Sequence, residues 1–279
     1  MGKARWFLEG SSHYATMLIG KKWGHHFPMH FVCSFPRSGS TWLSEMIADY
    51  LNLPRPSHYI FPVGFSSVIH THVRPNFGLN DCFYIYRDGR DCYLSFYYYL
   101  LKKLEEDGES FNEYRFWTKK FGKDKHQERI RENFCIYLEE QFKKKQNWNN
   151  HVSGWLAKAN FENNITAIQF EQLKKDPYNM LRRACLEKFE NVSDELLKEA
   201  IQRQSFKSQK KRNKDQHRTY IRRGATGDWK SLFCVESAQI FDHYAGETLV
   251  QLGYEKNSKW IYNYSEETKS NESSTPVRF

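Results

Sequence analysis

The apolar residues of this chain concentrate in short runs that longer polar segments separate. "HFVCSF" (30–35), "CFYIYR" (82–87) and "ITAIQF" (165–170) are apolar nearly throughout, whereas "SVIHTHV" (67–73) alternates between apolar and polar residues. Continuous apolar runs of this length predict buried strands, and the alternating segment also predicts a strand. The hydrophobic pattern therefore predicts four strands.

Segments with helical periodicity lie between and after these strands. The predicted helices cover residues 40–51, 89–103, 109–121, 126–145, 148–159, 177–189, 193–204 and 235–251. Apolar strands that alternate with helices predict an α/β domain with a central, mostly parallel sheet flanked by helices. Ligands of such sheets bind at the carboxyl ends of the strands. We therefore expect "FPRSGSTW" (35–42), "HTHV" (70–73) and Arg87 to share one crevice.

The composition suits one large domain with a sizeable core. The chain has 279 residues, of which 39% are hydrophobic and 16% aromatic. We expect one domain over 1–255 and a polar C-terminal tail over 256–279. No apolar run is long enough to span a bilayer, and the first residues lack a secretory signal. We therefore expect a cytoplasmic protein without a membrane span.

The cysteines give no sign of a metal site. Six cysteines occur, none of them in a CxxC pair, and their spacings match no zinc pattern. Cys33 and Cys82 lie in the apolar runs of two predicted strands. We interpret these two as reduced core residues.

The net charge of +9 comes almost entirely from one segment. Residues 203–223 hold nine Lys and Arg side chains against one acidic residue, Asp215. A solvated basic loop is one interpretation, and a site for an anion is the other. Only Phe206 and Tyr220 supply aromatic rings there, fewer than nucleic-acid binding usually requires. The segment therefore favours a small anionic ligand over nucleic acid.

"FPRSGSTW" has the features of an anion-binding turn between a strand and a helix. Such a turn points backbone N–H groups into a concavity at the positive end of the helix dipole. Arg37 adds charge, Ser40 and Thr41 add hydroxyl groups, and Gly39 allows close approach of the backbone. The GxxxxGK[ST] pattern of triphosphate sites is absent. The turn therefore favours one phosphate or sulfate without a metal, and an ordinary strand–helix turn is the alternative.

Six short motifs together resemble those of the PAPS-dependent sulfotransferases, where PAPS is 3′-phosphoadenosine 5′-phosphosulfate. "FPRSGSTW" is similar to YPKSGTTW, "HTHV" to KTHL, and "YRDGRDCYLS" (86–95) to the RNxxDxxxS element. "QFEQLKKDP" (169–177) is similar to YExLKxDP, "QSF" (204–206) to TSF, and "RRGATGDWKSLF" (222–233) to RKGxxGDWKxxF. The six occur in the family's order. The resemblance implies a strand–loop–helix like a P-loop that binds the 5′-phosphosulfate.

The resemblance also implies which residues hold the donor. PAPS is the co-substrate, PAP is the desulfated product, and no metal is expected. The 5′ end is expected to lie on the loop, and the 3′-phosphate on arginines and Ser95. Trp42 is expected to stack on adenine, with Phe206 assisting. The expected binding residues are Arg37, Ser38, Gly39, Ser40, Thr41, Trp42, Arg87, Ser95, Phe206, Arg222, Arg223 and Gly224.

His72 matches the general base of the family, and Arg37 occupies the place of its catalytic lysine. A base is needed because an acceptor hydroxyl (or amine) loses a proton as it attacks the sulfonate in line. Arginine supplies charge and hydrogen bonds but cannot give up a proton. His70, two residues earlier, could instead be the base or orient His72. An HxH pair also allows a metal site, for which no third ligand is evident.

The chain departs from the family pattern at several positions. Phe170 replaces a tyrosine, Gln204 replaces a threonine, and two polar positions of the family's dimer pattern have changed, so we do not assume that dimer. The aromatic residues in and around 58–66, 96–99, 116–117 and 148–155 suit a small acceptor with an aromatic, polycyclic or sugar hydroxyl, although core packing explains them equally. A kinase-like phosphotransferase and a non-catalytic nucleotide- or polyanion-binding protein are the alternative functions.

Overall fold

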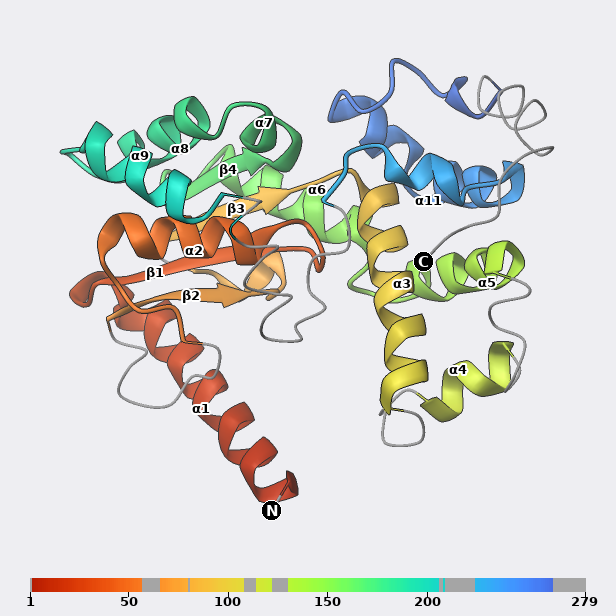
Figure 1. Ribbon diagram of the computed structural model, residues 1–279, viewed down its shortest axis with the longest axis horizontal. Helices are drawn as coiled ribbons and strands as arrows, with labels where there is room; N and C mark the ends of the chain where they lie inside the picture. Colours follow the sequence, from red (N-terminus) through yellow and green to blue (C-terminus); the bar gives the residue numbers. More distant parts are fainter. Residues whose placement is uncertain are drawn as a thin grey trace. The chain divides into compact units, whose positions relative to one another are not determined.

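The structure is a computed structural model (Figure 1) and describes residues 2–56, 66–79, 81–107, 114–121, 130–205, 208 and 224–262. The chain forms two compact units. The first, which we call the sheet unit, contains Met1–Arg87 and His151–Ile221. The second, which we call the aromatic unit, contains Asp88–Asn150 and Arg222–Phe279.

Four parallel strands form the sheet of the first unit. They are β1 (Met29–Ser34), β2 (Ser67–Thr71), β3 (Cys82–Tyr86) and β4 (Ile165–Gln169). Their order across the sheet is β2-β1-β3-β4, and every neighbouring pair runs parallel. The carboxyl ends of the strands therefore lie along one edge, as the apolar runs predicted. The predicted fold class is confirmed.

Side chains along each strand point alternately to the two faces of the sheet, and helices cover both faces. On one face Val32 and Phe83 pack into a core that includes residues of α2 (Ser40–Leu51), α8 (Pro177–Leu186) and α9 (Asp194–Arg203). On the other face lie Phe31, Cys33 and Tyr84 with Met17 and Trp155. Met17 belongs to α1 (Gly2–Trp23), and Trp155 to α6 (Trp148–Ala159).

The boundaries of three predicted helices match the structure, and two of the described helices were not predicted. The helices α2, α6 and α11 (Val235–Gln251) begin and end where the periodicity places them. The long helix α1 has no clear apolar face in its sequence, so periodicity alone does not reveal it. The short helix α7 (Phe170–Lys175) begins at Phe170, which the sequence pattern assigned to the preceding strand.

The aromatic unit is built from helices around a core of rings. Its elements are α3 (Gly89–Asp107), α4 (Tyr114–Phe121), α5 (Ile130–Phe142), η5 (Asp228–Ser231) and α11. Its fully buried rings include Tyr93, Trp117, Phe134, Tyr137 and Phe233. Trp260 is also buried and packs on Trp229, so the start of the predicted tail is held in this unit. The domain boundary at residue 255 stays a prediction.

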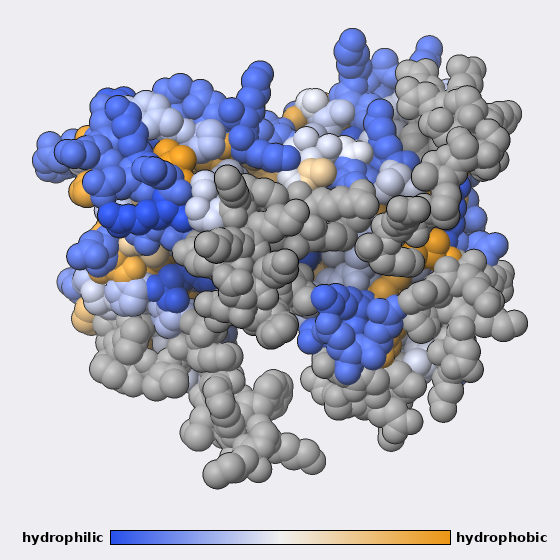
Figure 2. All heavy atoms as spheres, in the orientation of Figure 1, coloured by the Kyte–Doolittle hydropathy of each residue, from blue (hydrophilic) through white to orange (hydrophobic). Residues whose placement is uncertain are grey.

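The described surface is mainly hydrophilic on the face that Figure 2 shows, with apolar residues in small patches. Among the described helices, none combines the length and the apolar character needed to cross a bilayer. Short 3₁₀ turns complete the sheet unit, η1 at Gly24–His26 and η3 at Pro75–Phe77.

Candidate active site

The loop after β1 adopts the backbone of an anion-binding turn. Arg37 and Gly39 both have positive φ angles, of 71° and 94°. The left-handed conformation costs a non-glycine residue about 1–2 kcal/mol, so strain at Arg37 marks the loop as a functional candidate. Gly39 is the N-cap of α2 and has no side chain to cap the first N–H groups of the helix. Those groups, of Ser40 and the two residues after it, can bind an anion.

Gly39 is required by packing as well as by conformation. A Cβ atom at this position would lie 2.5 Å from Cδ2 of Phe170. The Phe170 ring therefore lies directly against the loop. Arg87 at the end of β3 places its guanidinium carbon 4.7 Å from the centre of the same ring. Phe170, which the sequence analysis noted only as a missing tyrosine, thus supports both the loop and Arg87.

Arg87 also contacts the loop backbone. Its Nη1 donates to the carbonyl oxygen of Arg37 at 3.3 Å. The residue is 7% exposed, and both contacts orient its guanidinium. The structure therefore brings together Arg37 and Arg87, which come from the carboxyl ends of β1 and β3, as predicted.

Two histidines from the end of β2 lie beside the loop. The rings of His70 and His72 are 4.6 Å apart and nearly perpendicular. His70 Nε2 is 2.7 Å from Ser40 Oγ, which accepts a hydrogen bond from Ser34 Oγ at 2.9 Å. His70 Nε2 therefore faces the Ser40 hydroxyl at the end of a hydroxyl chain that begins at Ser34.

The hydrogen bonds of His72 leave its other nitrogen as a base. Its Nδ1 lies 2.7 Å from the carbonyl oxygen of Ser34, which can only accept, so Nδ1 carries the proton. Nε2 then keeps its lone pair. Burial lowers the pKa of His72, and Arg37 lowers it further, although the Ser34 carbonyl opposes this. Burial also lowers the pKa of His70 well below 6.5, with His72 contributing. Both rings are therefore neutral at neutral pH.

The tautomer-setting residue is one that the sequence analysis missed. Ser34 ends β1, and its carbonyl and hydroxyl groups reach His72 and Ser40. Its position immediately before the loop was the one available signal. Within the part of the chain that the structure describes, no third His, Cys, Asp or Glu joins His70 and His72 at metal-binding distance.

The Trp42 ring lies edge-on to the Phe170 ring and is hydrogen-bonded to Gln204, the residue that follows α9. Its Nε1 donates to the carbonyl oxygen of Gln204 at 2.8 Å, and its ring lies at 74° to that of Phe170. The Gln204 side chain donates to Asp49 at 2.6 Å. Gln204 therefore links the segment after α9 to α2 and fixes the Trp42 ring beside the loop.

In the aromatic unit, one buried carboxylate joins the motifs "YRDGRDCYLS" (86–95) and "RRGATGDWKSLF" (222–233). Asp91 accepts hydrogen bonds from the backbone N–H groups of Gly227 and Trp229, both at 2.9 Å. The "GATGDW" turn is thereby tied to the first turn of α3, and Ser95 lies one turn further along the same helix. Gly224 has a positive φ of 58°, a conformation that favours glycine. Asp91 is the aspartate of the RNxxDxxxS-like element, and the motif alone did not predict this structural role.

Several predicted residues lie outside the described part of the chain. These are Phe206, Arg222, Arg223 and most of the candidate acceptor segment 58–66. The residues that are described fit an adenosine phosphosulfate at its 5′ end. The loop offers the N–H groups at the start of α2, which no side chain of the N-cap residue caps, the Arg37 guanidinium and a neutral histidine. This set can bind a phosphate or sulfate and remove a proton nearby.

Comparison with known proteins gives a consistent result. The family described as "Sulfotransferase domain" matches residues 69–253. Human sulfotransferase 1C2 is 22% identical over 256 residues, which cover 76% of this chain and 79% of the relative.

Solved structures share the fold. Mouse sulfotransferase SULT7A1 complexed with PAP gives a TM-score of 0.57 at 20% identity and covers 85% of this chain and 87% of its own. A retinol dehydratase complexed with retinol and PAP gives 0.58 at 15% identity and covers 80% and 81%.

Proposed function

Because the chain belongs to the sulfotransferase domain family, we propose that it transfers a sulfonate group from PAPS to a hydroxyl or amine of a small acceptor. PAP and the sulfated product leave, and one proton is released. The donor supplies the sulfonate on a phosphate leaving group. The observation that carries this proposal is the strained, glycine-capped loop with Arg37 and the His72 base beside it.

Our assignment for the 5′ end of the donor rests on the loop. The N–H groups at the start of α2 and the hydroxyl of Thr41 would bind its oxygens, together with Ser38 and Ser40. Arg37 would stabilise the negative charge that grows on the leaving phosphate, where fixed donors have their largest effect. Because an arginine stays protonated, the charge is stabilised without a proton being given up.

For the 3′ end we propose the arginine fork of Arg87 with Ser95. Arg222, Arg223 and the backbone at Gly224 would complete the grip, and Asp91 would hold that turn in shape. An arginine fork suits the paired oxygens of a phosphate. Trp42 would stack on adenine, with Phe206 on the other side. This part rests on the motifs. Within the sheet unit, Arg87 and Trp42 both lie against the Phe170 ring, which supports the assignment of these two residues.

His72 would act as the general base on the acceptor. Its Nδ1–H is held by the Ser34 carbonyl, so Nε2 can take the proton as the acceptor oxygen attacks sulfur. His70 would orient Ser40 rather than remove the proton, because its own Nε2 faces the Ser40 hydroxyl. The burial that keeps His72 neutral makes the base available at neutral pH.

For the acceptor, we propose a small molecule with an aromatic, polycyclic or sugar hydroxyl. Androsterone in one structural neighbour supports a polycyclic alcohol, and retinol in another supports a small apolar alcohol more generally.

We also place the protein in the cytoplasm. All six cysteines are free thiols, which the reducing cytoplasm maintains.

The proposal is tested first with PAP and then with PAPS. PAP at 100 times its Kd should stabilise the folded chain by about 2.7 kcal/mol, seen as a higher melting temperature. Adenosine monophosphate, which lacks the 3′-phosphate, is the matched control and should stabilise it less. Mass spectrometry should then detect a gain of one sulfonate on phenols, sterols or sugars, and none on their methyl ethers.

Two outcomes would contradict the proposal. Stabilisation by ATP with Mg²⁺ but not by PAP would indicate a kinase-like phosphotransferase. Stabilisation by PAP without transfer to any acceptor of these classes would leave a nucleotide-binding protein without this activity.

A further inference from the structure

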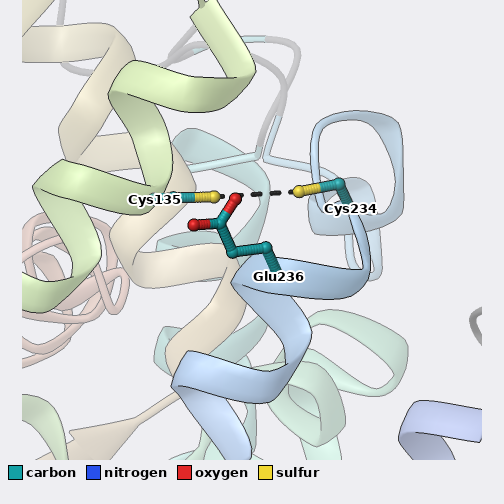
Figure 3. A group of neighbouring side chains, drawn as sticks. All are labelled: Cys135, Cys234 and Glu236. Carbon is teal, nitrogen blue, oxygen red and sulfur yellow. Dashed lines mark hydrogen bonds between the residues drawn. The ribbon is translucent and has the colours of Figure 1, made fainter.

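Two cysteines and a carboxylate converge in the aromatic unit, in a cluster that the proposed transfer reaction does not use. Cys135 on α5 and Cys234 before α11 have sulfur atoms 3.7 Å apart. The side chain of Glu236 points to the gap between them, as Figure 3 shows. One ligand atom from each residue lies within 4.8 Å of the others. We call these three residues the thiol cluster.

The two thiols differ in exposure and in hydrogen bonding. Cys135 is buried, whereas Cys234 is partly exposed. Cys234 is the N-cap of α11, and its sulfur accepts from the backbone N–H of Ser237 and, at 3.6 Å, from Ser237 Oγ. A helix N-terminus stabilises a thiolate. Cys234 therefore has the surroundings of a nucleophile that solvent can reach.

The ionisation of the pair follows this difference. The hydrogen bond from Cys135 lowers the pKa of Cys234 to about 5, with Ser237 contributing, although burial opposes it. The hydrogen bond with Cys234 raises the pKa of Cys135, and burial and the Glu236 carboxylate raise it further. These pKa shifts favour a thiolate at Cys234 beside a thiol at Cys135, and the Glu236 carboxylate lies next to both sulfur atoms.

We propose that Cys234 is a site of oxidation by peroxide and that Cys135 resolves the product into a Cys135–Cys234 disulfide. The Cys234 thiolate attacks one peroxide oxygen, the O–O bond breaks, and a sulfenic acid and hydroxide form. The Cys135 sulfur then attacks the Cys234 sulfur as its proton passes through Glu236, and the S–O bond breaks. The two thiols lose two electrons, and one peroxide becomes two water molecules.

A second cysteine pair provides an internal comparison. Cys33 and Cys82 lie on adjacent strands of the sheet, are both fully buried, and are hydrogen-bonded to each other. Burial raises the pKa of Cys33 well above its usual value. In both pairs the two sulfur atoms lie close together. Of the two pairs, only the thiol cluster has a partly exposed cysteine, Cys234, whose thiolate is stabilised. Cys33 and Cys82 should stay reduced.

The cluster could instead bind a thiophilic metal, but its geometry favours oxidation. Structural zinc sites hold four protein ligands, and catalytic zinc sites hold three. A cysteine binds a metal as a thiolate, so both Cys135 and Cys234 would have to be ionised. Within the described residues, the cluster has three candidate ligands, and the surroundings of Cys135 favour its protonated form.

The test is to treat the intact chain with one equivalent of hydrogen peroxide and map its peptides by mass spectrometry. We expect one intramolecular crosslink that joins the peptides of Cys135 and Cys234 and that dithiothreitol reverses. Cys135→Ala should leave a sulfenic acid at Cys234 that dimedone traps. Cys234→Ser should form no crosslink, and Cys185→Ala, at another buried cysteine, should crosslink like the unmodified chain. Thermal melting checks that each variant is folded.

Three results would overturn the proposal. One is that both thiols of the unmodified, folded chain stay reduced. Another is that Cys33 or Cys82 oxidises first. The third is a thiolate-to-Co²⁺ absorption band that disappears in Cys135→Ala, Cys234→Ser and Glu236→Gln alike, which would identify a metal site.

Discussion

Arg87 and Arg90 are separated by two residues in sequence and are both buried, but their surroundings differ. Arg90, in the aromatic unit, is 2% exposed and donates three hydrogen bonds to the Asp88 carboxylate and one to Glu255. Its guanidinium carbon also lies 3.9 Å from the centre of the Trp229 ring. Arg87, in the sheet unit, is 7% exposed, lies over the Phe170 ring and donates to a backbone carbonyl.

The difference lies in the partners of the two guanidinium groups. Two carboxylates compensate Arg90, so its role is to hold the helices and loops of its unit together. Arg87 has an aromatic ring and a backbone carbonyl among its contacts, and its binding of an anion is our proposal. Burial and residue type are alike at the two positions, so the contacts of each guanidinium are what distinguish the two arginines.

The largest effect is expected at the strand ends of the sheet unit. His72→Ala should lower the rate of sulfonate transfer by about 10²- to 10⁴-fold because the general base is removed. The increase in melting temperature on adding PAP should remain. His70→Ala is the matched control and should lose less activity. A normal rate in His72→Ala would contradict the base assignment and leave His70 as the candidate.

We also expect His72 to act as a base at pH values below the usual pKa of a histidine. Since burial lowers the pKa of His72, the neutral form persists at pH values below 6.5. The acidic limb of the kcat/KM profile should accordingly lie below pH 6.5, provided that the enzyme stays folded there.

The next effect concerns the compensated arginine. Arg90→Met should lower the free energy of unfolding by about 3–5 kcal/mol because it leaves the buried Asp88 carboxylate without its partner. Denaturant unfolding measures this loss. If Arg90→Met is as stable as the unmodified chain, the ion cluster is not structural, and the contrast with Arg87 fails.

The next effect is on the pH dependence of stability, which a buried neutral histidine changes and a permanently charged arginine does not. His151 is 1% exposed, lies 3.0 Å from the Tyr84 hydroxyl, and has a pKa that burial lowers to about 4. The unfolded chain binds its proton near pH 6.5, so the stabilisation is complete above that pH and is lost as the pH falls towards 4. The loss should reach roughly 3 kcal/mol.

His151→Gln should remove this part of the pH dependence, measured by urea unfolding between pH 7 and 4. His25→Gln changes an exposed histidine and should leave the dependence as it is. An unchanged slope in His151→Gln would show that this ring is not the titrating group.

The smallest effect is expected at Arg87. Arg87→Met should weaken PAP binding by about 1.5–3 kcal/mol, the usual value for hydrogen bonds to charged groups, and change stability less than Arg90→Met does. The PAP-dependent increase in melting temperature measures the loss. A variant that is unstable but binds PAP normally would reverse the roles of the two arginines.

Local sequence determined the four described strands, most of the described helices and the family. Apolar runs identified β1, β3 and β4, because strands buried on both faces need apolar residues throughout, and alternation identified β2. The six motifs identified the sulfotransferase family, which the comparisons confirm. The roles of the individual site residues stay predictions.

Tertiary structure decided how residues of the same type differ in their contacts. His70 and His72 cannot be told apart in "HTHV", but Ser34 and Ser40, from another strand and its loop, give them different hydrogen bonds. Cys135 and Cys234 are 99 residues apart in sequence, and only folding places their sulfur atoms side by side. Hydrogen bonds and burial depend on neighbours in space, so the sequence alone determined the chemical groups present, and the fold decided which of them meet.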